Sequence, residues 1–284
     1  MEKENLKRFF DPSETAQAVL EQGIKKTSIS AIKMTVLGIL AGAFIAFAAE
    51  ASNAAIYGIT KPGLPKTLAG ALFAAGLMLV IIAGGELFTG NSLIIVSVLA
   101  KKTKITGLLK NWFFVYLGNF LGSLLIAGLI YYSGQLNFSD GMLGAFTIKN
   151  AVYKTGLDFD NAVVMGILCN WLVCLAVWMA MAARDIAGKI LAIFFPIWLF
   201  ITSGFEHSIA NMYYIPAGIF AKSNPELVNK AIELGVSEQG LSGLNWSTMF
   251  TSNLLPVTLG NIIGGVIFVG TAYWFVYVRT GKKR

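Results

Sequence analysis

The sequence predicts an all-α polytopic membrane protein with six transmembrane helices. Of its 284 residues, 56% are hydrophobic and only 13% are charged, about half the charged fraction of a soluble domain. A chain of this length could bury a large core, but it lacks the charged surface that would keep that core in solution. Six apolar runs are also long enough to cross about 30 Å of hydrocarbon.

The six predicted spans cover residues 32–57, 67–100, 108–133, 161–183, 187–220 and 248–278. The second and fifth are too long for one straight helix, and both carry polar residues at mid-depth. These are Gly84, Gly85, Glu86, Thr89, Gly90 and Asn91 in the second span, and Ser203, Gly204, Glu206, His207 and Ser208 in the fifth. We expect each of these spans to be two half-helices separated by a break.

The basic residues predict which way the spans face. Sixteen of the 22 Lys and Arg lie in the two terminal segments and in the second-to-third and fourth-to-fifth connections, which fall on one side. Cytoplasmic segments collect Lys and Arg, so we expect both termini in the cytoplasm. The net charge of +7 thus reflects topology, and we expect no nucleic-acid partner. The charged start lacks signal-peptide features, which favours a multi-pass protein of the plasma (inner) membrane.

The cysteines and the histidine limit the chemistry. Cys169 and Cys174 lie in one apolar stretch, and their spacing is that of neither a redox pair nor a zinc site. With one histidine in the whole chain there is no haem or metal ligand set. We therefore expect no metal and no cofactor, and we interpret both cysteines as packing residues.

Three motifs recur in the same order in the two halves of the chain. The third and sixth spans share Asn-x6-Gly-Asn-x2-Gly, the second and fifth share Gly-x-Glu-x4-Asn, and the first and fourth share Gly-Ile-Leu; they begin at Asn111 and Asn253, Gly84 and Gly204, and Gly38 and Gly166. Because each half has three spans, we expect an inverted repeat of residues 32–133 and 161–278. Residues 32–278 form the predicted channel domain, between an amphipathic segment at 1–31 and a tail at 279–284.

The two breaks predict a path for an anion or a small polar solute. Broken helices at mid-membrane are tolerated where they line a cavity, and half-helix N-termini favour negative charge. Glu86 and Glu206 would lie at mid-depth, where ionisable groups are costly. They either cap the second half-helices or act directly on a proton or substrate.

His207 and two apolar residues are further candidates for lining this path. His207 could be a packed core histidine, but it sits at a break, and histidine has an unperturbed pKa near neutrality, so we favour a functional role. Phe73 and Leu77 lie one helical turn apart and share a face. They could form an apolar constriction, which a charged anion would cross with difficulty.

Four separated segments carry a family resemblance. Residues 84–91 read GGELFTGN, 170–178 read NWLVCLAVW, 204–212 read GFEHSIANM and 253–261 read NLLPVTLGN. In this order they resemble the formate/nitrite transporter family over nearly the whole chain. The resemblance implies an aquaporin-like six-helix protomer, a homopentamer with one pore per subunit, and passage of small monovalent anions or their conjugate acids.

The resemblance also implies roles for individual residues. Thr89 and His207 match the family's central polar pair, Asn170 a mid-membrane asparagine, and Lys154 a lysine of the external vestibule. Residues 12 to about 26 resemble an amphipathic helix proposed to gate the pore. The positions that match the family's constriction are Phe73, Leu77, Phe88, Val173 and Phe200. The residues expected to support the breaks are Glu86, Asn91, Glu206 and Asn211.

Formate is the leading substrate, because residues 204–212 and the Asn-x-x-Pro-Val-Thr of the sixth span look closest to the formate members. Nitrite and hydrosulfide are the alternatives within the family, and a water or neutral-solute facilitator is another. A membrane enzyme using His207 and Glu206 as an acid-base pair is the reading from a different class. It lacks a nucleophile set and a second histidine, so we expect no catalytic residue. The expected partners are the anion, membrane lipid and further copies of the chain.

Overall fold

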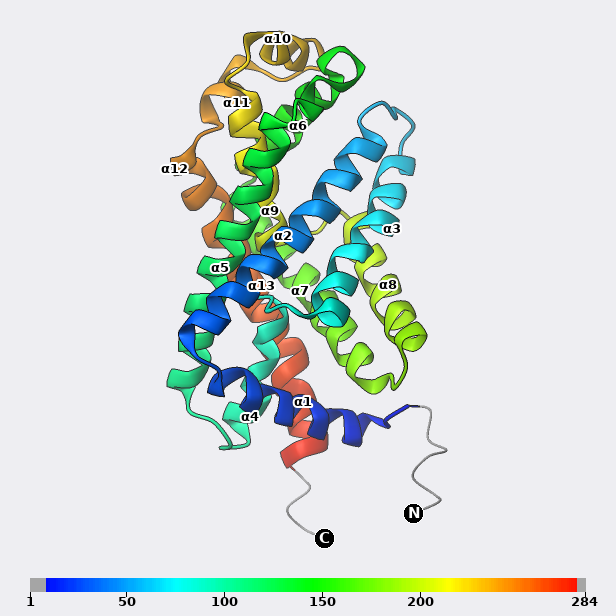
Figure 1. Ribbon diagram of the computed structural model, residues 1–284, viewed down its shortest axis with the longest axis vertical. Helices are drawn as coiled ribbons and strands as arrows, with labels where there is room; N and C mark the ends of the chain where they lie inside the picture. The colour runs from blue at the N-terminus through cyan, green and yellow to red at the C-terminus, as the bar shows by residue number, and fades with distance from the viewer. Residues whose placement is uncertain (1–8, 280–284) are drawn as a thin grey trace.

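The computed structural model describes residues 9–279 of the chain, and this part is a bundle of helices (Figure 1). The ends of the predicted terminal segments, residues 1–8 and 280–284, lie outside the described part. They include six of the basic residues counted toward the cytoplasmic side: Lys3, Lys7, Arg8, Lys282, Lys283 and Arg284.

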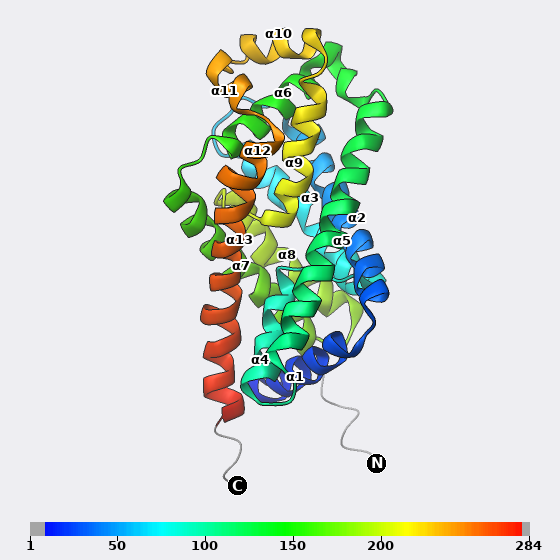
Figure 2. The ribbon, with the colours of Figure 1, turned by 90° about the vertical axis from the view of Figure 1, so that its left-hand side faces the viewer.

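Five helical segments of the described part are long and apolar enough to cross a membrane. They are α2 (Ala31–Ile56), α3 (Leu64–Met78) with the π-helical turn η2 (Leu79–Gly84), α5 (Ile105–Tyr132), α7 (Phe159–Ala182) and the continuous segment Trp246–Val278. That last segment joins α12 (Trp246–Thr248), η5 (Met249–Leu254), α13 (Leu255–Ile263), η6 (Gly264–Thr271) and η7 (Trp274–Val278), and Figure 2 shows it running down one side of the molecule. The prediction of an all-helical, multi-pass membrane protein is confirmed.

The predicted spans at 67–100 and 187–220 are both interrupted. The first contains α3 with η2, and then η3 (Gly90–Ile94) and α4 (Ile95–Leu99) after an extended stretch. The second consists of α8 (Ile186–Thr202) and α9 (Ser208–Ala221), each too short to count as a full span. Gly84 and Gly204 have φ values of 98° and 73° at the two interruptions, a conformation that glycine adopts without the steric cost of a Cβ.

Small residues let the long helices of each half pack closely. A Cβ on Gly118 of α5 would lie 2.5 Å from the carbonyl oxygen of Thr35 on α2. A Cβ on Gly260 of α13 would lie 2.1 Å from the carbonyl oxygen of Val163 on α7. Both contacts meet backbone, which cannot yield, and such small-residue interfaces are how apolar helices approach one another in membranes. The glycines of the Asn-x6-Gly-Asn motif therefore hold equivalent helix pairs together.

Helix α1 (Pro12–Ser28) lies across one end of the bundle, against α4, α7 and η7 (Figure 1). It begins at Asp11, whose side chain accepts from the Ser13 and Glu14 backbone N–H groups, while Glu14 accepts from the Asp11 N–H. This capping box fixes the helix start. The face turned to the bundle carries Thr15, Ala16, Val19, Leu20 and Gly23.

The opposite end, which we call the α10 end, holds helices that the sequence reading left as connections. They are η4 (Gln135–Asn137), α6 (Phe138–Thr155), α10 (Pro225–Glu233) and α11 (Glu238–Gly243). Figure 2 shows α10 and α11 capping the bundle far from α1, with α6 reaching inward beside α9. These amphipathic, charge-bearing helices are too short or too polar to be read as spans, so hydropathy alone does not reveal them.

Candidate functional site

The two breaks bring Thr89 and His207 together, although 118 residues separate them in the chain. Thr89 Oγ1 lies 3.0 Å from His207 Nε2, and both side chains are buried. The site therefore has a hydrogen-bonded polar pair at the point where both interrupted helices end. This is the juxtaposition that the resemblance implied.

The other ring nitrogen fixes the state of His207. The backbone N–H of Ala210 donates to His207 Nδ1 over 3.0 Å, so this nitrogen is an acceptor and carries no proton. The neutral ring then bears its proton on Nε2 and donates to Thr89 Oγ1, which leaves the threonine hydroxyl proton available to another acceptor. The imidazole also serves as the N-cap of α9.

Aromatic rings enclose this pair on the α3 and α8 sides. The Phe73 ring centroid lies 6.5 Å from that of His207, and the Phe200 centroid 5.9 Å from it. Phe73 and Phe200 meet edge to face at 5.9 Å. Leu77 lies one turn beyond Phe73 on α3, and all of these side chains are buried. The polar pair thus sits in apolar surroundings.

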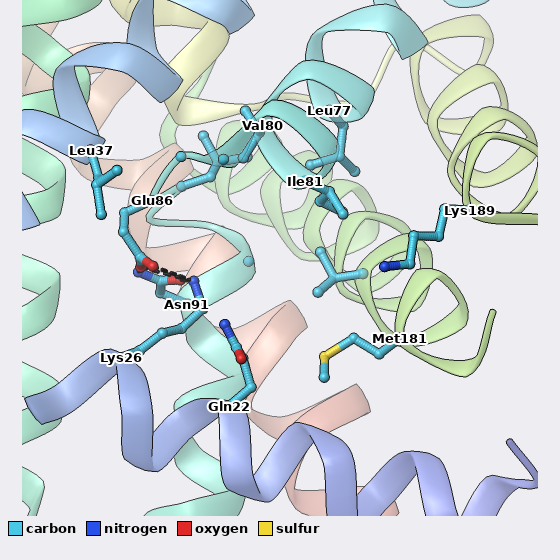
Figure 3. A pocket seen from close by; sticks show the side chains of 15 residues that line it. Gln22, Lys26, Leu37, Leu77, Val80, Ile81, Glu86, Asn91, Met181 and Lys189 are labelled. Carbon is cyan, nitrogen blue, oxygen red and sulfur yellow. Dashed lines mark hydrogen bonds and ion pairs between the residues drawn. The ribbon is translucent and has the colours of Figure 1, made fainter. Parts of the chain in front are cut away.

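A cavity of about 380 Å³ opens between α1 and the break that follows η2 (Figure 3). Leu77, Val80 and Ile81 line the α3 side, and Met181 and Lys189 come from α7 and α8. Leu77, one turn from Phe73, is therefore the α3 residue that lies both in the cavity lining and on the helix face of Phe73. The remaining lining residues are Gln22, Lys26, Leu37, Gly84, Gly85, Glu86, Leu87, Gly90, Asn91 and Val177.

Figure 3 shows an ion pair in this cavity. Lys26 of α1 donates to both carboxylate oxygens of Glu86 at 2.8 Å and to Asn91 Oδ1 at 2.9 Å. Asn91 Nδ2 donates in turn to Glu86 at 2.7 Å and to Asn111 Oδ1 at 2.8 Å, and Asn111 Nδ2 donates to the Lys26 carbonyl. A lysine on the amphipathic helix thus becomes part of the site.

An equivalent network lies on the α10 side of the polar pair. Lys154 of α6 donates to the two oxygens of Glu206 at 2.9 and 3.0 Å. Asn211 Nδ2 donates to Glu206 and to Asn253 Oδ1, both at 2.7 Å, and Asn253 Nδ2 donates to the Lys154 carbonyl. The site therefore consists of a central polar pair with one lysine–glutamate network toward each end.

The expectation that the glutamates cap the second half-helices is wrong. Both carboxylates are occupied by lysine and asparagine side chains. The Phe88 N–H instead donates to Asn119 Oδ1 at 3.0 Å, and the Ser208 N–H to Asn261 Oδ1 at 2.9 Å. The physical reason is charge: a buried carboxylate pairs with an ammonium, and the neutral carboxamides are left to satisfy the freed N–H groups.

Asn119 and Asn261 therefore secure the breaks. Asn119 Nδ2 donates to the carbonyls of Gly38 and Glu86 at 2.8 and 2.9 Å, while Asn261 Nδ2 donates to those of Gly166 and Glu206 at 2.8 and 3.0 Å. Each carboxamide bridges a break to a neighbouring long helix. The repeated Gly-Asn motif placed both residues, but nothing in the sequence alone assigned them this role.

The other predicted site residues hold the surroundings of the pair. Asn170 Nδ2 lies within hydrogen-bonding distance of the Thr89 carbonyl, Ser92 Oγ and the Asn261 carbonyl, so it braces the first break. Val173, one turn along α7, is buried in the core. The Phe88 ring packs against Trp112 and Tyr116 of α5, with ring centroids 5.7 and 4.8 Å apart.

Lys26 was missed as a site residue. The available signal was the repeat: Asn111 and Asn253 occupy matching positions, so a lysine bonded near one predicts a lysine near the other. Cys169 and Cys174 are buried free thiols, as the packing interpretation expects. Within residues 9–279 no three His, Cys, Asp or Glu side chains gather as a metal site.

Comparisons with known proteins place the chain in a family. Residues 13–275 match the model of the formate/nitrite transporter family. The chain is 39% identical over 289 residues to a probable formate transporter of Methanothermobacter thermautotrophicus, covering 95% of this chain and 98% of that one. It is 38% identical over 272 residues to the formate channel FocA of Escherichia coli K12, covering 94% of both.

Solved structures show the same fold. A pentameric formate channel with formate bound aligns with a TM-score of 0.77 at 37% identity, over 88% of this chain and 98% of that one. An ion channel of the same family aligns with a TM-score of 0.76 at 29% identity, over 93% and 98%. On the family model, the near full-length identity and the shared fold, the chain belongs to the formate/nitrite transporter family.

Proposed function

We propose that this protein is a formate channel that moves the anion, or its conjugate acid, across the plasma membrane as a homopentamer. Nitrite and hydrosulfide are the alternative substrates. The observation that carries the proposal is the buried contact between Thr89 and His207, set in apolar surroundings between two lysine-bearing networks. The formate channels among the relatives and the pentameric neighbour support it. We place the α1 end, with both termini, in the cytoplasm.

The lysines draw the anion toward the centre. Lys26 and Lys154 each lie in a partly enclosed site, with side-chain exposures of 20% and 10%, where a charge is felt more strongly than in bulk water. Because each lysine ammonium is already paired with a glutamate carboxylate, an entering anion shares the ammonium with that carboxylate and does not bind an unpaired cation. The networks therefore concentrate the anion without trapping it.

The apolar surroundings set the condition for passage. Moving an ionised carboxylate past Phe73, Leu77 and Phe200 without hydrogen-bond partners is very costly, whereas the neutral acid loses far less. The Thr89 hydroxyl then donates a hydrogen bond to one substrate oxygen, while His207 Nε2–H donates to Thr89 Oγ1. The substrate thus crosses the centre in its neutral form.

The proton comes from vestibule water rather than from His207. Its Nδ1 is occupied by the Ala210 N–H, so forming an imidazolium would break the cap of α9. A neutral ring that gave up its Nε2 proton would become an imidazolate, which is unfavourable in these surroundings. His207 therefore acts as a hydrogen-bond donor that orients Thr89.

The ionisable side chains of the site favour transport over catalysis. The sequence has a single histidine, and its Nε2 is engaged by Thr89 while Glu206 is engaged by Lys154. An acid-base pair of His207 and Glu206 would need both groups free to face a substrate. We therefore propose no enzymatic activity. We also retain the inverted repeat of 32–133 and 161–278, the channel domain 32–278, and a gating role for α1.

The test is a side-by-side flux assay in proteoliposomes with formate, nitrite, hydrosulfide and water. Formate flux well above that of the other solutes supports the proposal, and water flux alone overturns it. In the same assay His207→Phe separates the proton sources. A pH profile that keeps its shape, at reduced flux, is expected; loss of the pH dependence would make the histidine the proton donor.

A further inference from the structure

A third carboxyl lies buried away from the two lysine networks. Glu50 is on α2 and is only 4% exposed. Its Oε2 accepts a hydrogen bond from the hydroxyl of Tyr213 on α9, which is fully buried. Its Oε1 is buried without a hydrogen-bond partner. The mechanism proposed above uses neither residue.

Glu50 differs from the other two buried glutamates in having no cation. Glu86 is paired with Lys26 and Glu206 with Lys154, whereas within residues 9–279 no Lys, Arg or His lies within 4.0 Å of the Glu50 carboxylate. An ionised carboxylate in such a place is very costly, and a buried group in this situation takes up a proton instead. Because no cation of the described part neutralises the Glu50 carboxylate, a proton from solvent does so.

Asn53 connects Glu50 to helix α6. It lies one turn beyond Glu50 on α2, and its Nδ2 is also buried without a partner. A single water can donate to Glu50 Oε1 and accept from Asn53 Nδ2, satisfying both atoms. Asn53 Oδ1 accepts from Asn150 Nδ2 at 3.1 Å, and Asn150 precedes Lys154 by one turn of α6. The polar line from Glu50 therefore runs toward the Lys154 network.

The other half of the chain shows that the fold does not need a polar pair here. Counted from Gly38 and Gly166, the position matching Glu50 is Trp178; counted from Glu86 and Glu206, the position matching Tyr213 is Leu93. Trp178 and Leu93 are both buried in one apolar cluster. Asn53 likewise matches the apolar Met181. An apolar contact is thus sufficient for packing at this place.

We propose that Glu50 is a proton-binding site that exchanges with the α10-end vestibule through a water held by Asn53. A hydronium ion in that vestibule gives its proton to Glu50 Oε1 through this water and leaves as water; the reverse step returns it. When Glu50 is neutral, only Glu206 opposes the attraction of Lys154 for anions. Ionised Glu50 adds a negative charge nearby and repels them.

The consequence for transport rests on the proposed function. Anion entry from the α10 end rises as that side becomes more acidic, and entry from the α1 end has no such control because Trp178 and Leu93 carry no charge. The other titratable groups on elements packed against α2 are Tyr214 on α9, Asp140, Lys149, Tyr153 and Lys154 on α6, Lys110, Tyr116, Tyr131 and Tyr132 on α5, and Lys66 on α3. Only Tyr213 is bonded to Glu50 in the described part.

Infrared difference spectroscopy of the full-length protein in liposomes tests the site without transport. A protonated-carboxyl C=O band should appear on acidification, be lost in Glu50→Gln, and shift in frequency in Tyr213→Phe, which removes the hydrogen-bond donor. The matched control Trp178→Phe should keep the band. A wild-type spectrum that Glu50→Gln leaves unchanged overturns the proposal. If Glu50→Gln does not fold, the double variant E50W/Y213L, which copies the apolar pairing of the other half, takes its place.

Formate uptake into oriented membrane vesicles tests the transport consequence. With the pH varied on one side at a time, Glu50→Gln should lose the part of the pH dependence that belongs to the α10 side and keep the rest. An unchanged α10-side dependence overturns the coupling. If the wild type carries no formate while the infrared band behaves as expected, the proposed function fails and the proton site stands.

Discussion

The networks around Glu86 and Glu206 each consist of one lysine, one glutamate and two asparagines with nearly the same connections, but they are built from different parts of the chain. Lys26 makes one further bond, to Asn91 Oδ1, whereas Asn211 Oδ1 has no hydrogen-bond partner in the described part. Lys26 comes from α1, a helix lying across the outside of the bundle, while Lys154 comes from α6, which reaches into it. The Lys26 side chain is 20% exposed and the Lys154 side chain 10%. Both ends of the site therefore have a lysine–glutamate network, but the network at the α1 end is more accessible to solvent.

The central pair shows a different relation between the halves. One residue beyond Glu206 is His207, and one beyond Glu86 is Leu87; three beyond Glu86 is Thr89, and three beyond Glu206 is Ile209. Each half therefore contributes one polar residue from a different position. The two halves repeat the same scaffold of helices, but together they form one Thr89–His207 pair at the centre.

The largest effect is expected where the two halves hold their helices together. Gly260→Leu would push a side chain into the Val163 carbonyl. Overpacking costs about 1–3 kcal/mol where neighbouring side chains can shift, and it costs more here because the contact is with backbone. We expect loss of the folded oligomer, measured by size-exclusion chromatography in detergent, and a similar loss for Gly118→Leu. Gly128→Leu is the control, because a Cβ there meets nothing within 4 Å. A Gly260→Leu protein that elutes like the control would contradict the close-packing argument.

Replacing the two lysines one at a time should destabilise the protein to different extents. Lys154→Met leaves the Glu206 carboxylate buried and unpaired, which costs about 3–5 kcal/mol, while Lys26→Met leaves the more accessible Glu86 and costs less. Thermal unfolding in detergent should therefore drop further for Lys154→Met. The double variant K154M/E206M should recover much of the loss. Equal losses at the two ends would refute the difference in burial.

The bracing asparagines should respond alike. Asn119→Ala leaves the Phe88 N–H without its acceptor, and Asn261→Ala does the same to the Ser208 N–H. A buried unsatisfied group costs about 1–3 kcal/mol. We expect comparable decreases in the thermal midpoint for the two variants. If one of them were neutral, the two breaks would not be secured in the same way.

The smallest structural effect is expected at Thr89. Thr89→Val keeps the shape but removes the hydroxyl, whose hydrogen bond contributes about 0.5–1.5 kcal/mol to stability or to substrate passage. Formate flux should fall roughly 2- to 10-fold with the fold intact. Thr147→Val is the control, because that buried hydroxyl bonds only within its own helix, to the Leu143 carbonyl. Equal flux in the two variants would remove Thr89 from the pathway.

Hydropathy and the internal motifs predicted the apolar helices and both breaks, because their signals are local in sequence. The pairing of Thr89 with His207 came from the family resemblance, since no local pattern joins residues 118 positions apart. Lys26 was missed because the amphipathic helix carries two adjacent lysines, Lys25 and Lys26, and sequence does not say which of them reaches the bundle. Glu50 falls within the first predicted span, but its burial depends on the register of α2 against α9, which only the structure gives.

The His207 side chain has two roles. Its Nδ1 caps helix α9 by accepting from the Ala210 N–H, and its Nε2 is hydrogen-bonded to Thr89. Selection at this position therefore acts on two traits at once. In a saturation library, Asn, Ser and Asp would preserve the helix start and be recovered in a screen for expression, yet fail in a screen for transport. Comparing the two screens would reveal how much of the constraint on this residue comes from folding and how much from the solute.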